Sequence, residues 1–285
     1  MKRSYPGAEK CADEVLADWE ITAPPVNPFE IAKKCGIKVK VDTSGENPGF
    51  SGALIKSGDR FGIVCFSNNN RGFLNFTLAH ELGHYHLPGH PDLLFANGRT
   101  QHLSRAGFVS SDEHETEADH FAAALLMPKR FVKQVLAKAE PGLASVRRMA
   151  DDLGTSLTAS AIRYAKLSPD PVAVVVSEGD KIHYCFCSVS LRDLPGEIWI
   201  RKGSLLPPGC NTLRLGHENT REVDGDTLLS DWFDGAPEAE VYEQAVHLGS
   251  YGRVLTVLSS DDSIELEEPM EERMAKYFTN GRAGS

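Results

Sequence analysis

The sequence NFTLAHELGHYHL, residues 75–87, decides how this chain folds around its functional centre. Its apolar residues recur at three- and four-residue spacing, which predicts a helix with one buried face. Ala79 and Gly83 are small enough to let a neighbouring element pack closely against that face. His80 and His84 are four residues apart, so on a helix they lie one turn apart on the same side. Two imidazoles at this spacing can reach one tetrahedral zinc ion.

Glu81 follows the first histidine and would point toward the coordination position that protein ligands leave open. A zinc ion with three protein ligands lowers the pKa of a bound water to about 7 and polarises a carbonyl group. A carboxylate beside it can take the proton of that water and pass it to a leaving amine. The pattern HExxH arises by chance on the order of 0.03 times in a chain with this many histidines, so its helical context matters. The motif predicts metal-dependent hydrolysis, with Glu81 as the general base.

The third metal ligand is predicted from the segment EHETEADHFAAALLMP, residues 113–128. Wound at 100° per residue, this helix places Glu115 about 50° from the centre of its apolar stripe, Glu117 about 110° and Glu113 about 150°. A ligand must point inward, so we predict that Glu115 binds the metal and that the other two glutamates are solvated. Asp119, one turn after Glu115, can hydrogen-bond a ligating imidazole and select its tautomer.

His90 is the alternative third ligand. It follows His84 by six residues, which is the spacing of the third histidine in metzincins. That pattern has a glycine for a sharp turn where this chain has Leu87, although Pro88 and Gly89 offer a turn slightly later. Four other histidines are expected on the polar surface around the cleft: His86, His102, His114 and His120.

Three segments together resemble the ImmA/IrrE family of intracellular metallopeptidases: PPVNPFEIAKKCGIKV (24–39), NFTLAHELGHYHL (75–87) and ETEADHFAAALLMP (115–128). The resemblance covers roughly residues 8–140. It implies a gluzincin-like fold with Zn²⁺ on His80, His84 and the glutamate that matches Glu115, and with Glu81 as the base. Members of this family cut helix-turn-helix repressors in stress or mobile-element switches. The expected function is therefore that of a zinc endopeptidase whose protein substrate is such a repressor.

The expected fold class is α+β, with three parts. A zincin-like metallopeptidase domain is expected over residues 1–140, a helix-turn-helix-like helical segment over 141–169, and a C-terminal α/β domain over 170–285. The sequence Ser168-Pro169-Asp170-Pro171 marks the last boundary. One branch of the family continues into a helix-turn-helix-like segment and a GAF-like domain, which implies a GAF-like fold and a sensor for a small ligand here.

The helix-turn-helix-like segment carries little positive charge. Residues 143–167 contain four basic and two acidic side chains, and 4 − 2 is a net charge of +2. That is too little for a DNA reader, so we interpret the segment as a packing scaffold. The alternative function is a DNA-binding or scaffold regulator with a structural metal site. Glu81 argues against it, because a structural site has no need of a base beside its open position.

Short alternating segments predict three strands at 37–41, 49–56 and 60–66, and helices at 8–20 and after Asn27. Residues 88–111 are rich in turn formers and predict a long surface excursion, which we interpret as a gate over the cleft. Four later segments are strand-like: 171–176, 181–187, 197–202 and 253–258.

The composition limits which binding partners and which cellular location are expected for this chain. A formal net charge of −10 opposes non-specific binding to nucleic acid. No run approaches the 18 or so apolar residues of a membrane span. The N-terminal sequence lacks the apolar core of a secretory signal, so a cytoplasmic location is expected. Six cysteines in 285 residues are too sparse for a disulfide framework.

Overall fold

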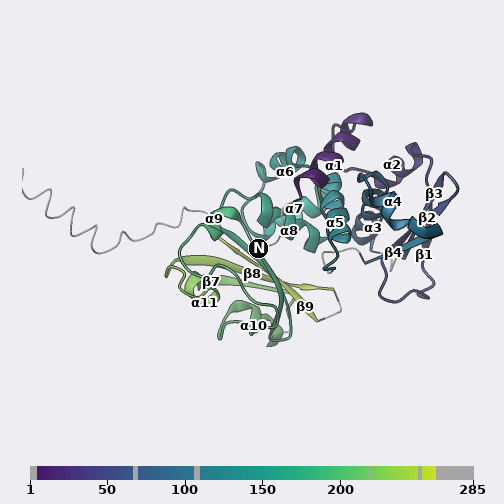
Figure 1. Cartoon of the computed structure of the whole chain (residues 1–285). Helices are drawn as coiled ribbons and strands as arrows, with labels where there is room; N and C mark the ends of the chain where they lie inside the picture. The colour runs from purple at the N-terminus through teal and green to yellow at the C-terminus, as the bar shows by residue number, and fades with distance from the viewer. Residues whose placement is uncertain (1–4, 67–69, 106–109, 218–219, 250–251, 261–285) are drawn as a thin grey trace, which may run out of the picture. The chain divides into compact units, whose positions relative to one another are not determined.

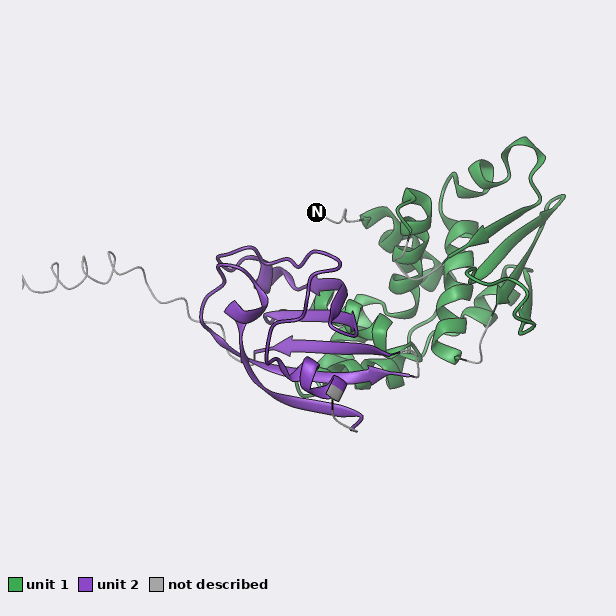
Figure 2. Cartoon of the chain, turned by 90° about the horizontal axis from the view of Figure 1, so that it is seen from below, with its two compact units in different colours: residues 1–167 green, residues 168–285 purple. Residues whose placement is uncertain are grey.

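The computed structural model describes residues 5–66, 70–105, 110–217, 220–249 and 252–260. The chain divides into two compact units, residues 1–167 and residues 168–285 (Figure 2). The expected boundary near Ser168 coincides with this division, and the helix-turn-helix-like segment lies in the first unit. No helix in the described part of the chain has the length and apolar character needed to cross a membrane.

The first unit contains one mixed four-stranded sheet in the order β1-β3-β2-β4. Its strands are β1 (Lys38–Asp42), β2 (Gly52–Ser57), β3 (Arg60–Phe66) and β4 (Gln101–Ser104). Strand β1 runs parallel to β3, whereas β2 is antiparallel to both β3 and β4. The three strands expected from alternation are present, and β4 forms the edge of the sheet.

The long surface excursion expected over 88–111 contains regular secondary structure in its described residues. The segment forms helix α4 (His90–Leu94), a short 3₁₀ turn (Ala96–Gly98) and strand β4. The residues of β4 carry no alternating pattern of their own, and the strand exists because β2 supplies its hydrogen-bonding partner. Residues 106–109 of the expected gate lie outside the described residues.

Among the described residues of the first unit, six α-helices precede the helix-turn-helix-like segment. Besides α4 they are α1 (Pro6–Asp18), α2 (Pro28–Lys34), α3 (Arg71–His86), α5 (Glu113–Leu126) and α6 (Lys129–Leu136). Asn27 caps α2 as expected, with its side chain accepting from the backbone of Phe29. Helix α3 begins earlier than residue 75 because Asn70 caps it in the same way. It packs against β2 and β3 on one side and against α5 on the other (Figure 1).

Helices α7 (Leu143–Leu153) and α8 (Leu157–Leu167) complete the first unit, joined through Gly154 in the left-handed conformation at φ +66°. This is the pair of short helices expected around that glycine. The Arg163 side chain of α8 is only 3% exposed. It donates to the backbone oxygen of Met127 and to Glu9. Arg163 therefore serves packing within the unit rather than an outward-facing surface.

The second unit is built on a five-stranded sheet in the order β6-β5-β9-β8-β7. Its strands are β5 (Val172–Glu178), β6 (Lys181–Cys187), β7 (Glu222–Leu228), β8 (Glu240–Leu248) and β9 (Arg253–Ser259). Its helices are α9 (Val189–Arg192), α10 (Asn211–His217) and α11 (Leu229–Trp232). Every strand pair is antiparallel, so the described part of this unit is α+β and not the expected α/β.

Residues 197–202, expected as a strand, form no ladder. The Glu197 amide donates to the backbone oxygen of Asp234, and the Trp199 amide donates back to Glu197. The apolar alternation of this segment instead lets Ile198 pack into the core of the second unit. The GAF-like fold remains a prediction.

Candidate metal centre

Helices α3 and α5 bring His80, His84 and Glu115 together. The two Nε2 atoms of His80 and His84 are 3.1 Å apart. Glu115 Oε1 lies 3.1 Å from His84 Nε2, and its Oε2 lies 3.5 Å from His80 Nε2. One donor atom from each residue falls within 4.8 Å of the other two. Two imidazole nitrogens and a carboxylate converging in this way match the donor set of a zinc site with one open position.

Asp119 fixes the orientation of the first histidine, as the sequence predicted. Its Oδ1 lies 2.8 Å from Nδ1 of His80, and both side chains are buried. A proton held between these two atoms leaves the Nε2 lone pair free for a metal. Burial alone would lower the pKa of His80, but hydrogen bonds to Asp119 and Glu115 raise it to about 10.

Glu81 is fully buried beside these ligands. Neither of its carboxylate oxygens has a hydrogen-bond partner among the described residues. Burial raises the pKa of Glu81 to about 7, although the nearby imidazoles of His80 and His102 oppose the rise. Strand β2 passes directly over this carboxylate: a Cβ added to Gly52 would lie 2.7 Å from Glu81 Oε1. An uncompensated buried carboxylate is costly, which indicates a group kept for chemistry rather than for stability.

Glu115 is held by contacts from the opposite wall as well. His102 on β4 places its Nε2 2.8 Å from Glu115 Oε1, and the Arg105 amide donates to Oε2. Burial tends to raise the pKa of Glu115, but the imidazoles of His102, His80 and His84 lower it well below its usual range. His102 was expected only on the polar surface around the cleft. No local pattern marks it, because its position depends on the unexpected strand β4.

A cavity of about 420 Å³ opens beside Glu115 along the edge strand. Its wall includes polar groups of the centre, apolar side chains and two arginines. The residues are Phe50, Leu93, Leu94, Arg99, His102, Leu103, Arg105, Ser110, Asp112, His114 and Glu115. The outer groups of this wall, such as Leu93 and Arg99, are exposed to solvent. The cavity is large enough for several side chains of an extended peptide.

His90, the alternative third ligand, does not join this group. Its Nδ1 lies 3.1 Å from Nδ1 of His84, on the side of that imidazole away from His80 and Glu115. Its Nε2 lies 3.0 Å from Glu117 Oε2. Glu117 was expected on a solvated helix face; its side chain is 34% exposed and contacts His90. Glu113, the remaining candidate, is exposed as expected.

Residues 62–164 match the family model of the IrrE N-terminal-like domain, Peptidase_M78. The first unit carries an IrrE N-terminal-like domain. The match spans α3, β4 and α5, and therefore includes His80, Glu81, His84 and Glu115. The resemblance to the ImmA/IrrE family is confirmed for this part of the chain, and the matching family model is one of peptidases.

One solved structure extends the likeness beyond the IrrE N-terminal-like domain. A Mycobacterium tuberculosis transcriptional regulator has a similar fold over 89% of this chain and 76% of that chain, with a TM-score of 0.57 and 14% sequence identity. At that identity the likeness concerns the fold alone. Among curated proteins, none matches this chain in sequence.

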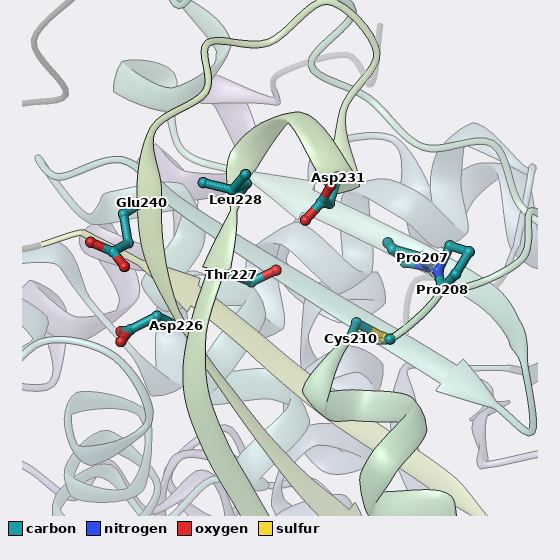
Figure 3. Close-up of a pocket in the computed structure, with 9 residues that line it drawn as sticks. Pro207, Pro208, Cys210, Asp226, Thr227, Leu228, Asp231 and Glu240 are labelled. Carbon is teal, nitrogen blue, oxygen red and sulfur yellow. The ribbon is translucent and has the colours of Figure 1, made fainter.

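The second unit holds a cavity of about 280 Å³ between β7, α11 and the turn at Pro207-Pro208. Figure 3 shows the Thr227 side chain directed toward that turn, whereas Asp226 and Glu240 point away from it. Burial raises the pKa of the nearby Cys210 thiol to about 11, so this cysteine is not an activated nucleophile. This cavity has room for a small ligand.

Proposed function

We propose that this chain is a zinc-dependent endopeptidase, with the metal held by His80, His84 and Glu115. The observation that supports it best is the convergence of two imidazoles and one carboxylate beside the buried, unpartnered carboxylate of Glu81. A zinc ion held there would supply a Lewis acid for the carbonyl of a scissile peptide bond. A structural site would need a fourth protein ligand, whereas this one has a base next to its open side.

The role of Glu81 is proton transfer. Its carboxylate takes a proton from the attacking water and delivers it to the amide nitrogen that leaves as an amine. Burial favours the protonated form of Glu81, which helps this carboxylate to hold the proton between the two transfers. Asp119 and the fixed His80 keep the ligands in place, so the helix need not move during the reaction.

The wall of the cavity indicates how a peptide would bind. Strand β4 is an edge strand, so its free side can hydrogen-bond an extended peptide as an added strand. Leu93 and Leu103 offer apolar contacts, while Arg99 and Arg105 favour acidic side chains. We infer an extended substrate segment that carries apolar and acidic residues near the cleaved bond.

A helix-turn-helix repressor in a stress or mobile-element response is the substrate that the family resemblance implies. The fold shared with a transcriptional regulator supports a regulatory setting. In this proposal the second unit senses a small ligand and modulates the rate, and the protein acts in the cytoplasm. Any such ligand can act only through different affinities for two forms of the protein.

The test is to incubate the zinc-loaded protein with helix-turn-helix repressors encoded beside it and to identify fragments by mass spectrometry. We expect discrete fragments that disappear when a chelator strips the zinc and return when zinc is restored. A zinc-loaded protein that leaves every candidate repressor intact would contradict the proposed substrate. Metal analysis that finds no zinc on the purified chain would contradict the mechanism itself.

The alternative is a DNA-binding or scaffold regulator with a structural metal site. The likeness to a transcriptional regulator favours it, together with the helix pair α7–α8. The charges of this pair are largely engaged within the unit: Arg163 binds Glu9, and Arg148 pairs with Asp152. A mobility-shift experiment with operator DNA at low and moderate salt separates the two functions, since only the alternative requires a sequence-specific complex.

A further inference from the structure

A second cluster of metal-ligating side chains lies beside the candidate zinc site. His90, His114 and Glu117 bring one ligand atom each within 4.8 Å of the other two. The Nε2 of His90 is 3.0 Å from Glu117 Oε2, and the Nδ1 of His114 is 3.8 Å from the same oxygen. The Nδ1 of His114 is buried and has no hydrogen-bond partner among the described residues. The cluster is either another metal site or a hydrogen-bonded support for the first one.

If zinc binds as proposed, the positions of the protons on the His84 and His90 imidazoles decide between a second metal site and a hydrogen-bonded support. His84 offers the Nε2 lone pair to the zinc, so the proton of its neutral imidazole resides on Nδ1. That N–H faces Nδ1 of His90 at 3.1 Å, and His90 must therefore accept there. The proton of His90 then resides on Nε2 and is donated to Glu117 across 3.0 Å. In this arrangement His90 has no lone pair left for a metal.

We propose that His90 and Glu117 form a hydrogen-bonded relay that holds His84 in its metal-binding tautomer. The relay is the counterpart of Asp119, which does the same for His80 through one direct hydrogen bond. Both ligating imidazoles are thus connected to a carboxylate by hydrogen bonds: His80 directly, and His84 through His90. A terminal carboxylate raises the basicity of the ligating nitrogen and restricts rotation of the ring. The inference rests on the proposed function, because it assumes a metal at Nε2.

The chain path beyond α3 serves this contact. Gly89 adopts φ +82°, a left-handed conformation that favours glycine, and the backbone then enters α4 at His90. The His90 amide donates to the backbone oxygen of Leu87, which keeps the turn tight. The turn returns His90 to His84, and its side chain is only 2% exposed. This geometry also explains why the metzincin spacing is present although His90 is not among the converging ligands.

The experiment measures zinc affinity in the full-length protein by competition with a coloured chelator, and the visible spectrum of the cobalt-loaded protein. We expect His90→Ala to weaken zinc binding about 10- to 100-fold, and Glu117→Gln to weaken it about 10-fold. His90→Asn keeps an acceptor for His84 and should restore part of the affinity. His114→Ala is the matched control, because His114 belongs to the cluster but not to the relay. Its zinc affinity and cobalt bands should equal those of the wild type.

The outcomes separate the relay from its alternatives. Wild-type affinity and unchanged cobalt bands in both Glu117→Gln and His90→Ala would overturn the relay while leaving the zinc site intact. Glu117 is partly exposed, so its variant remains informative if His90→Ala fails to fold. Two metal ions per wild-type chain, with the second lost in His114→Ala, would establish a second metal site instead. A wild-type chain that binds no zinc would refute the proposed function, and the relay with it.

Discussion

At the scale of single residues, two buried glutamates of the centre have opposite protonation behaviour. Burial raises the pKa of Glu81 to about 7, whereas Glu115 has a lowered pKa because three imidazoles outweigh its burial. Glu115 therefore stays an anion, as a metal ligand must, and Glu81 can exchange a proton near neutral pH. Pairs of carboxyl groups whose environments separate their pKa values are typical of sites with distinct acid–base roles.

Glu81→Gln tests the role of the base. The amide keeps the size of the side chain and removes its ability to take a proton. We expect zinc content to stay at the wild-type level while the cleavage rate falls about 10²- to 10⁴-fold. The measurement is the initial rate on a cleaved repressor, with metal analysis of the same sample. Undiminished cleavage in this variant would rule out Glu81 as the base.

Glu115→Ala tests the third ligand against a matched position on the same helix. Removal of the carboxylate leaves two imidazoles, so we expect the loss of stoichiometric zinc. Glu113→Ala removes an exposed glutamate two residues earlier and should retain the metal. Zinc per chain, measured after dialysis, decides between them. If Glu115→Ala keeps one zinc ion per chain, as Glu113→Ala is expected to do, then Glu115 is not a ligand.

At the scale of elements, the site depends on the close approach of α3 and α5. A Cβ added to Gly83 would lie 3.1 Å from Phe121 Cδ1 and 3.2 Å from the backbone of Ala118. The small residues expected to allow close packing do so, and this contact sets the separation between the histidines and Glu115. The ligand geometry is thus a consequence of helix packing and not of the motif alone.

Gly83→Ala should destabilise the protein although alanine is the better helix former. Overpacking typically costs about 1–3 kcal/mol, which exceeds the roughly 1 kcal/mol gained from helix propensity. Gly216→Ala in α10 is the control, since nothing lies within 4 Å of its added Cβ, and it should be neutral or stabilising. Chemical denaturation of both variants measures the difference. If Gly83→Ala were more stable than the wild type, α5 would have to shift to accommodate the added methyl group without destabilising the protein.

A partly buried ion cluster joins three other helices of the first unit, α1, α6 and α8. The carboxylate of Glu9 on α1 forms ion pairs with Lys129 on α6, at 2.7 Å, and with Arg163 on α8, at 2.8 Å. Burial would raise the pKa of Glu9, but these two partners lower it to about 2. The folded-state pKa lies below the ordinary value of 4.5, so the cluster stabilises fully above about pH 4.5. That contribution is lost as the pH falls toward 2.

Glu9→Gln should therefore lower the melting temperature at neutral pH, and its difference from the wild type should shrink as the pH falls from about 4.5 toward 2. Thermal unfolding across this pH range measures the difference in melting temperature between Glu9→Gln and the wild type. Glu14→Gln on the same helix is the control: Glu14 pairs with Lys10 at 3.5 Å on the exposed surface, and its effect should be small. A gap that stays constant with pH would contradict the lowered pKa of Glu9.

At the scale of the whole molecule, all residues of the candidate metal centre lie within the first unit. A chain that ends at Leu167 should therefore fold and bind one zinc ion. In our proposal the second unit modulates the rate, so the truncated protein should cut the same bond at a different rate. The measurement compares both proteins on one repressor, with and without cell extract. Identical rates under both conditions would remove the regulatory role of the second unit.

Features with local geometry could be predicted from the amino-acid sequence. Helix periodicity placed His80 and His84 on one face, pointed Glu115 inward and put Asp119 within reach of an imidazole, because side-chain direction on a helix follows from residue spacing. Only the tertiary structure decided the rest. Strand β4 with His102, the contact of His90 with Glu117 and the burial of Arg163 each depend on a partner distant in the sequence. Such distant partners determine which strands pair and where a loop folds back, so no local sequence pattern predicts these features.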